Sequence, residues 1–133
     1  MTIIFCVDDK NGLLFGGKRQ SKDRALRARV LAHAVGHTIW MTPYSASQFD
    51  DCAAISVSDD CARDVGYEDY WFAECDNIPI DRADRVIVYR WNRHYPATSF
   101  FTTDFAAQGF SLVSSEDFEG YSHEAITETI YTR

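Results

Sequence analysis

The chain has 133 residues, the length of one domain, since domains most often contain roughly 100–150 residues. Its composition is 46% hydrophobic, 14% aromatic and 25% charged, which supports a packed core and excludes a disordered tail. The formal net charge of −7 repels phosphate backbones and argues against a nucleic-acid partner. We therefore expect a single domain over residues 1–133.

No apolar stretch is long enough to cross a membrane. The longest ones, residues 3–7 and 84–89, have the size of strands, whereas a bilayer span takes ~20 residues. The N-terminus has no basic start and reaches Asp8 and Asp9 too early for a secretory signal. We expect a cytoplasmic protein with no membrane partner.

The cysteines and histidines are spaced too widely to predict a metal site, because structural zinc sites use paired ligands at short spacing. We therefore expect reduced thiols and no bound metal. The side chains considered are Cys6, Cys52, Cys61, Cys75, His33, His37, His94 and His123.

The first third of the chain predicts a strand followed by a flexible loop. Residues 2–7 are β-branched and aromatic and run into Asn11-Gly12, a strong turn signal. Gly16-Gly17 permits unusual backbone angles. We expect a mobile loop there that acts as a hinge.

An amphipathic helix of about fifteen residues should follow this loop. Ser21 is suited to cap its first turn, and Asp23 complements the positive end of the helix dipole. Leu26 and Val30 recur at helical spacing, and Gly36 lies where a glycine ends a helix.

The centre of the chain alternates strands with short helices, which favours a largely parallel sheet. The C-terminus instead predicts two antiparallel strands joined through Glu119-Gly120. A short helix over residues 123–133 is the alternative, but Thr127 and Thr129 are β-branched and favour strand. Strands are expected at residues 37–42, 52–58, 70–73, 85–90, 110–114 and 126–131, and helical turns at 43–49 and 59–64.

Two segments carry the features of an anion site. Residues 18–29 have a net charge of +5, which leaves −12 on the rest of the chain. Residues 89–96 read Tyr-Arg-Trp-Asn-Arg-His-Tyr-Pro at the end of a strand, where arginine forks bind anions and aromatic faces stack on planar rings. The alternative is a packed loop whose arginines pair with surface acids. The predicted substrate-binding residues are Lys18, Arg19, Arg90, Trp91, Arg93, His94 and Tyr95.

From end to end the chain resembles the dihydrofolate reductase family. The features that match are an opening apolar strand, a flexible loop, a helix with an acid near its start, the stretch Gly36-His37-Thr38-Ile39-Trp40-Met41 and the C-terminal hairpin ending at Arg133. The resemblance implies a mostly parallel central sheet with flanking helices. It also implies that Asp23 is the family acid that hydrogen-bonds a pterin ring and assists proton delivery, whereas a plain helix-start carboxylate is the alternative for this residue.

The resemblance implies NADPH as the cofactor, but the family's glycine-rich phosphate turn is missing. The matching region reads Trp71-Phe72-Ala73-Glu74-Cys75-Asp76, which puts two acids where a phosphate would lie. Pro43-Tyr44-Ser45 replaces the residues that hold the other phosphate. The cofactor therefore stays unassigned.

Serine and histidine near the C-terminus, at residues 114–117 and 122–124, raise the question of hydrolase chemistry. No GxSxG motif is present, and neighbours in sequence rarely form a catalytic triad. A polar hairpin is the simpler interpretation.

The sequence thus predicts a reductase-like domain that binds a planar, anionic, pteridine- or nucleotide-like molecule. The competing hypothesis is a non-catalytic binding or interaction module on the same scaffold. Both require that the basic segment before the first helix and the bend at residues 90–95 face each other across one cleft.

Overall fold

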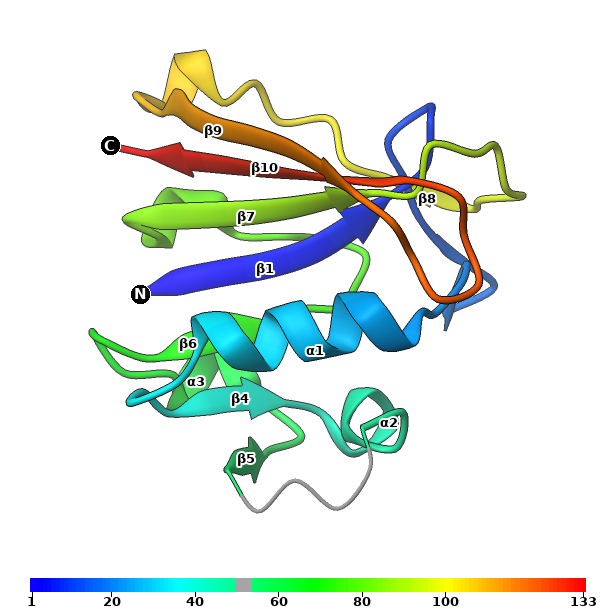
Figure 1. The fold of residues 1–133 in the computed structure, drawn as a ribbon. Coiled ribbons are helices and arrows are strands. Elements are labelled where there is room, and N and C mark those ends of the chain that lie inside the picture. Colours follow the sequence, from blue (N-terminus) through cyan, green and yellow to red (C-terminus); the bar gives the residue numbers. More distant parts are fainter. Residues whose placement is uncertain (50–53) are drawn as a thin grey trace.

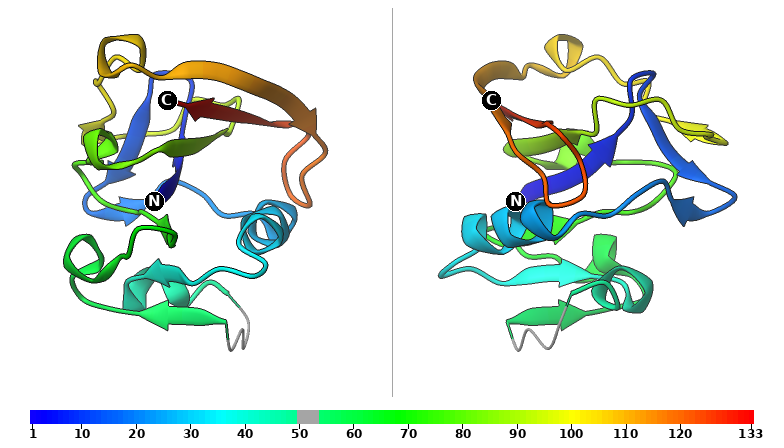
Figure 2. Two further views of the ribbon diagram at one scale, coloured as in Figure 1. Left: turned by 90° about the vertical axis from the view of Figure 1, so that its left-hand side faces the viewer. Right: turned by 45° about the vertical axis from the view of Figure 1, so that its right-hand side comes forward.

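Helical segments lie on both faces of one twisted sheet in the computed structural model, which describes residues 1–49 and 54–133 (Figures 1 and 2). The sheet has seven strands in the order β5-β4-β6-β1-β7-β10-β9, and a smaller sheet has the order β3-β2-β8. The strands are β1 Thr2–Val7, β2 Gly12–Phe15, β3 Lys18–Arg19, β4 Ile39–Met41, β5 Ile55–Val57, β6 Tyr70–Phe72, β7 Arg85–Arg90, β8 Ser99–Phe100, β9 Ser111–Phe118 and β10 Ile126–Thr132. The helices are α1 Arg24–His33, α2 Pro43–Ala46 and α3 Cys61–Asp64, with 3-10 turns η1 Ile80–Arg82 and η2 Ala106–Gln108.

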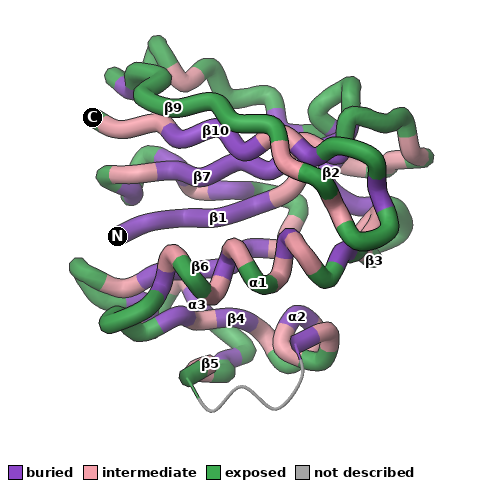
Figure 3. The backbone as a smooth tube through the Cα atoms, viewed as in Figure 1, coloured by how far each residue is buried: buried purple, intermediate pink, exposed green. Residues whose placement is uncertain are grey.

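The central strands run parallel, and the chain closes with an antiparallel hairpin, as the sequence predicts. Strand β1 pairs in parallel with β6 and β7, and β4 pairs in parallel with β5 and β6. Strand β10 runs antiparallel to both β7 and β9. Because β1 is covered on both faces it is almost wholly buried, whereas β9 lies at the sheet edge and is exposed along its length (Figure 3).

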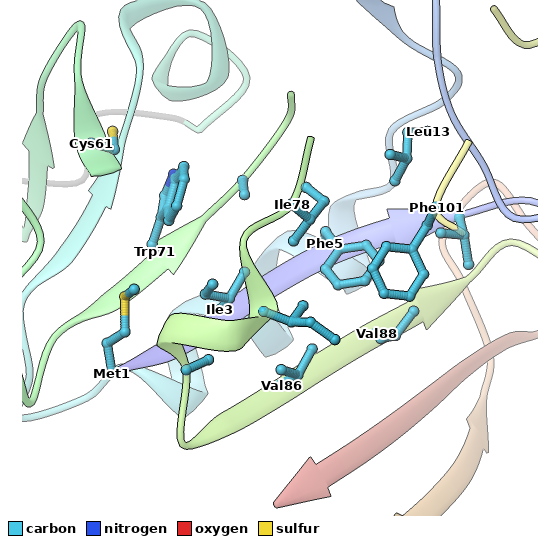
Figure 4. Close-up of a cluster of buried hydrophobic side chains, with 14 of the residues drawn as sticks. Met1, Ile3, Phe5, Leu13, Cys61, Trp71, Ile78, Val86, Val88 and Phe101 are labelled. Atoms are coloured by element: carbon cyan, nitrogen blue, oxygen red, sulfur yellow. The ribbon is translucent and has the colours of Figure 1, made fainter. Parts of the chain in front are cut away.

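Side chains alternate along β1, so the strand contributes to two cores. Ile3 and Phe5 point to the face covered by α3 and η1, where Phe5 packs on Phe101 with ring centroids 4.8 Å apart (Figure 4). Ile4 points to the opposite face, where it belongs to the same core as Leu26 of α1. The sheet thereby fixes the position of α1, and Figure 2 shows that helix on one face only.

Helix α1 is capped by Asp23 and not by Ser21, so the predicted cap is wrong. The Asp23 backbone is extended (φ −151°, ψ 135°), and its carboxylate accepts from the amides of Ala25 and Leu26. The helix has ten residues, not about fifteen, because it ends at His33. The last turn of the predicted helix is instead a turn with Gly36 at φ +83°.

The other predicted elements exist, and several have different bounds: β9 and β10 extend beyond the predicted strands, while others are shorter. The helix expected at residues 43–49 ends at Ala46, and the strand expected at 37–42 covers only β4. Of the strand expected at residues 52–58, β5 supplies the described part, while Cys52 and the rest of residues 50–53 lie outside the described residues. The flexible loop predicted at Gly16-Gly17 is a hairpin turn, since Phe15 pairs with Lys18.

Candidate functional site

A hollow of about 380 Å³ lies between the β2-β3 hairpin and the bend that follows β7. We call it the outer hollow. The hairpin turns at Gly16 and Gly17, whose φ angles of +57° and +78° suit glycine. This tight turn positions Lys18 and Arg19 opposite Tyr95. The lining consists of Phe15, Gly16, Lys18, Arg19, Gln20, Tyr95 and Pro96.

Asp8, at the end of β1, holds the bend against the hairpin. Its carboxylate accepts from the amide of Tyr95 at 3.1 Å, from the amide of Gly12 at 2.7 Å and from Gln20 Nε2 at 3.1 Å. Burial raises the pKa of Asp8, but these backbone hydrogen bonds outweigh it and lower the pKa from its usual value. An ionised carboxylate therefore ties together the two walls of the outer hollow.

A second, smaller hollow lies deeper, and we call it the inner hollow. Its volume of about 20 Å³ has room for about one water molecule. Arg19 and Gln20 line both hollows, so the inner one lies behind the outer one. The inner lining consists of Cys6, Leu13, Leu14, Arg19, Gln20, Ser21, Ala73, Glu74, Cys75 and Trp91.

The positive charge of Arg19 is balanced by Glu74. Arg19 Nε and Nη2 donate to the two carboxylate oxygens at 2.9 and 3.0 Å, and the side chains are only 17% and 10% exposed. The guanidinium also lies 4.1 Å from the ring centroid of Tyr44. Lys18 Nζ lies 4.9 Å from the same ring, and Lys18 is exposed. Lys18 is therefore the lining cation whose charge no ion pair balances among the described residues.

Gln20 offers an unused hydrogen-bond acceptor between the two hollows. Its Nε2 donates to Asp8 and to the Pro96 carbonyl at 3.1 and 3.4 Å, which fixes the orientation of the amide. Its Oε1 is buried and has no hydrogen-bond partner within residues 1–49 and 54–133. A buried acceptor without a partner is unfavourable, and a ligand N–H would satisfy it.

The structure brings the two predicted segments together across one cleft, but it divides the predicted residues. Lys18, Arg19 and Tyr95 line the outer hollow, and Arg19 and Trp91 line the inner one. Arg90 instead donates to Asn11 at 3.2 Å. A role in ligand binding stays a prediction for all of these residues.

The remaining two predicted residues, Arg93 and His94, are exposed. The Arg93 carbonyl accepts from the Asp9 amide at 2.9 Å, and His94 Nδ1 lies 3.9 Å from Asp8. Neither residue is part of the lining of either hollow. Their binding role also stays a prediction.

Asp23 is buried and does not line either hollow. Its Oδ1 accepts from three amides, those of Ala25, Leu26 and Tyr121, at 2.8, 3.3 and 3.0 Å. Its Oδ2 accepts from the amide and hydroxyl of Ser122 at 2.9 and 3.2 Å and contacts His123 Nδ1 at 2.8 Å.

The protonation state of Asp23 follows from these donors. Burial raises the pKa of this carboxyl, but hydrogen bonds from the His123 ring and from three backbone amides outweigh it and hold the pKa well below its usual range. Asp23 is thus an ionised group with its oxygens already occupied. Its predicted role toward a pterin stays a prediction.

The residues present do not fit NADPH in the family manner. At the end of β6, where the family has its glycine-rich turn, the Glu74 carboxylate is held by Arg19 and by Gln48 Nε2 at 3.2 Å. The Arg19–Glu74 ion pair thus occupies the place where a glycine-rich turn would leave the backbone open to a phosphate. Helix α2 has only four residues and supplies little helix dipole.

The sequence pattern does not indicate Gln20, Glu74 as an ion-pair partner, Ser21 as a lining residue, or the contact between Asp23 and His123. Asp23 and His123 are 100 positions apart. A local pattern cannot reveal such a pair, and only the order of the strands indicates that the β9-β10 loop returns to the start of α1.

Together the sheet order, the α1 cap and the C-terminal hairpin define a dihydrofolate reductase-like fold. A dihydrofolate reductase from Enterococcus faecalis, solved with NADP(H) and RAB-propyl, superimposes with a TM-score of 0.68 over 99% of this chain and 95% of its own. The sequence identity is 12%, so the likeness concerns the fold. No protein-family model and no curated protein matches the sequence.

Two further features of the described residues concern membrane insertion and metal binding. None of the helices there is both long and apolar enough to traverse a bilayer. Within residues 1–49 and 54–133, no group of three or more His, Cys, Asp or Glu side chains is placed to hold a metal ion.

Proposed function

We propose that this chain binds a planar, anionic small molecule in the outer hollow, and that it does so without NADPH. The observation that carries the proposal is the lining itself: the apolar faces of Phe15 and Pro96 lie beside the cation Lys18 and the unpartnered acceptor of Gln20. A pteridine or purine with an anionic substituent matches all three features.

Each part of the lining selects a different part of such a ligand. Phe15 is 53% exposed, and covering its ring by a flat heterocycle removes apolar surface from water. Lys18 attracts the anionic group, and its charge lies in a chain that is otherwise acidic. Gln20 Oε1 accepts from a ring N–H or an amino group.

The binding test uses folate and guanosine monophosphate as anionic probes and guanosine as the neutral control. Trp91, in the inner lining, reports binding by its fluorescence. We expect at least one anionic probe to bind below millimolar concentration, about tenfold more tightly than guanosine, since one ionic contact contributes on the order of 1.4 kcal/mol. Absence of binding by both anions at millimolar concentration would overturn the proposal.

Two lysine variants distinguish a direct contact between Lys18 and the ligand from a general electrostatic attraction by the basic segment. Lys18→Ala should weaken probe binding about fivefold or more. Lys22→Ala removes the same charge from the same basic segment, but Lys22 is outside both linings, so its effect should be small and screened by salt. Equal losses in the two variants would contradict a specific site.

The reductase version of the function is tested separately with the cofactor. The Glu74 carboxylate favours the alternative, in which the fold has lost NADPH binding and serves only for binding or interaction. We expect no fluorescence change with NADPH up to millimolar concentration, and no loss of NADPH absorbance when dihydrofolate is added. Binding and oxidation of NADPH would establish the reductase version instead.

A further inference from the structure

The loop between β9 and β10 reaches the start of α1 (Figure 1), and a serine, a histidine and an aspartate meet there. Ser21 Oγ lies 2.9 Å from His123 Nε2, and His123 Nδ1 lies 2.8 Å from Asp23 Oδ2. The two contacts use opposite nitrogens of one imidazole. This is the relay found between nucleophile, base and carboxylate in serine hydrolases.

The hydrogen-bond partners assign the proton on the histidine. Asp23 is ionised and can only accept, so His123 Nδ1 carries the hydrogen. In the neutral imidazole Nε2 is then the acceptor, and the hydroxyl of Ser21 donates to it. The imidazole therefore has the tautomer that a general base for Ser21 requires.

The base and the carboxylate are rigid and shielded from water. The side chains of His123 and Asp23 are 4% and 0% exposed, and the imidazole stacks on Trp91 with ring centroids 4.7 Å apart. Ser21 is only partly buried and lines the inner hollow. A buried base next to an accessible hydroxyl is the arrangement that nucleophilic catalysis needs.

We propose that Ser21, His123 and Asp23 form a nucleophilic triad that hydrolyses esters of small carboxylic acids. Ser21 and His123 are the catalytic residues, and Asp23 is a positioning residue that acts through the histidine. Because the inner hollow beside Ser21 has room for only about one water molecule, the substrates are restricted to esters of the smallest acids, and the rest of the ester lies in the adjoining outer hollow. The proposal stands apart from the proposed ligand function, because a small neutral ester is sufficient to test it.

The reaction balances without a further reactant. Ser21 Oγ bonds to the acyl carbon as its proton moves to His123 Nε2, and that proton then goes to the leaving alkoxide when the carbon–oxygen bond breaks. Water next attacks the acyl carbon and gives a proton to His123 Nε2, and that proton goes to Ser21 Oγ as the bond between Oγ and the acyl carbon breaks. The products are a carboxylic acid and an alcohol.

Tyr95 is the donor available to the developing oxyanion. Its hydroxyl lies 3.2 Å from His123 Nε2, next to Ser21, and Tyr95 lines the outer hollow. Because the Ser21 hydroxyl takes the lone pair of Nε2, the hydrogen of the Tyr95 hydroxyl is available to the negative oxygen of the tetrahedral intermediate. A donor of this kind contributes to rate and not to folding.

The first test measures hydrolysis of 4-nitrophenyl acetate and labelling by a fluorophosphonate, with the labelled residue located by mass spectrometry. Ser21→Ala should lower kcat/KM by about 100-fold or more and abolish the label. Ser115→Ala, an exposed serine on β9, is the matched control and should change neither. A label on another residue, or full activity in Ser21→Ala, would overturn the proposal.

The second test detects the base directly. In Ser21→Cys, transfer of the thiol proton to His123 should give thiolate absorbance at 240 nm and alkylation by iodoacetamide at mildly acidic pH. Cys6, Cys61 and Cys75 give a low background, since burial raises the pKa of Cys6 and Cys61 and raises that of Cys75 to about 11. Cys52 lies outside the described residues, so the signal of the parent protein, which has Ser21, is subtracted as the background. Ser115→Cys is the control, and equal reactivity of the two variants would overturn the proposal.

The positioning role of Asp23 is tested in the same background. Adding Asp23→Asn to Ser21→Cys should remove the thiolate signal, because the amide no longer holds the Nδ1–H tautomer. Circular dichroism confirms that the double variant is folded before the comparison is made. If the folded double variant keeps the thiolate signal, Asp23 does not position the histidine.

Discussion

Helix α1 carries a buried carboxylate–histidine pair at each end, and the two pairs differ in design. At the N-terminal end, Asp23 contacts His123 at 2.8 Å. At the C-terminal end, His33 contacts Glu128 on β10 at 3.0 Å. Asp23 and Glu128 are 2% and 3% exposed. The two carboxylates are therefore similar in burial and in distance to their histidines, but the His123 side chain is 4% exposed and that of His33 is 23% exposed, and the surroundings of the two pairs also differ.

Asp23 is held mainly by the backbone, whereas Glu128 is held by other side chains. Four amides and the Ser122 hydroxyl donate to Asp23 besides the histidine. Glu128 accepts from Tyr89 at 2.8 Å and has Arg29 at 3.5 Å. Backbone donors fix a group more rigidly than long side chains do. A rigidly placed carboxylate such as Asp23 is suited to catalysis, whereas a cluster of opposite charges such as that around Glu128 is suited to stabilising the fold.

Removing Asp23 should have the largest effect. Asp23→Ala leaves several buried amides and the His123 ring without an acceptor, and we expect a loss of about 3 kcal/mol in the free energy of unfolding. Urea denaturation followed by circular dichroism measures it. Asp9→Ala is the control, because Asp9 is exposed, and it should cost less than about 0.5 kcal/mol. A loss as small as the control's would show that the amides find other partners.

Removing Glu128 should cost less, about 2 kcal/mol, since its partners are side chains that can turn toward water. His33 is 23% exposed, and Arg29 is 31% exposed. Glu128→Gln should lose less than Glu128→Ala because the amide oxygen still accepts from Tyr89. The same urea experiment ranks the variants, and a Glu128→Ala loss larger than that of Asp23→Ala would reverse the comparison.

The fold was predictable because its signals are local. Residues 2–7 and 85–90 are continuous apolar strands, and they form the parallel pair β1 and β7 at the centre of the sheet. The cap of α1 was assigned two residues early, since Ser21 and Asp23 are both good caps. Asp23 and not Ser21 caps the helix, and the Ser21 hydroxyl instead contacts His123, a residue far away in the sequence.

The site was predictable only in outline. A basic segment and an aromatic bend indicated the cleft, and both line it through Lys18 and Tyr95. The neutralisation of Arg19 by Glu74 was not predictable, because the two residues are 55 positions apart. The contacts of His123 with Ser21 and Asp23 were not predictable for the same reason, because they join residues that are far apart in the sequence and no local motif indicates them.

Lowering the pH should reduce the stabilising contribution of both carboxylate–histidine pairs, and the contribution of the N-terminal pair should fall more steeply. The folded-state pKa values of Asp23 and Glu128 are lowered, since hydrogen bonds from their partners outweigh burial. Their stabilising contributions are therefore present above the unfolded carboxyl pKa of about 4 and are lost as pH falls through the folded values. Urea midpoints measured at falling pH should decline below about pH 4, and Asp23→Asn should flatten this decline more than Glu128→Gln. An equally steep decline in Asp23→Asn would contradict the assignment.

The smallest effect is expected at the rim of the C-terminal pair. Arg29 forms an exposed ion pair with Glu116 at 3.1 Å and lies over Phe118 at 4.0 Å. Such pairs contribute about 0.5 kcal/mol, and Arg29→Ala should lose no more than about 1 kcal/mol in urea. Glu128 retains His33 and Tyr89 as partners in this variant. The lost Arg29–Glu116 pair is exposed and therefore screened by salt, so the loss should shrink in high salt. A loss near that of Glu128→Ala would mean that Arg29 is needed to hold Glu128 ionised, and the two ends of α1 would then be less different than their contacts suggest.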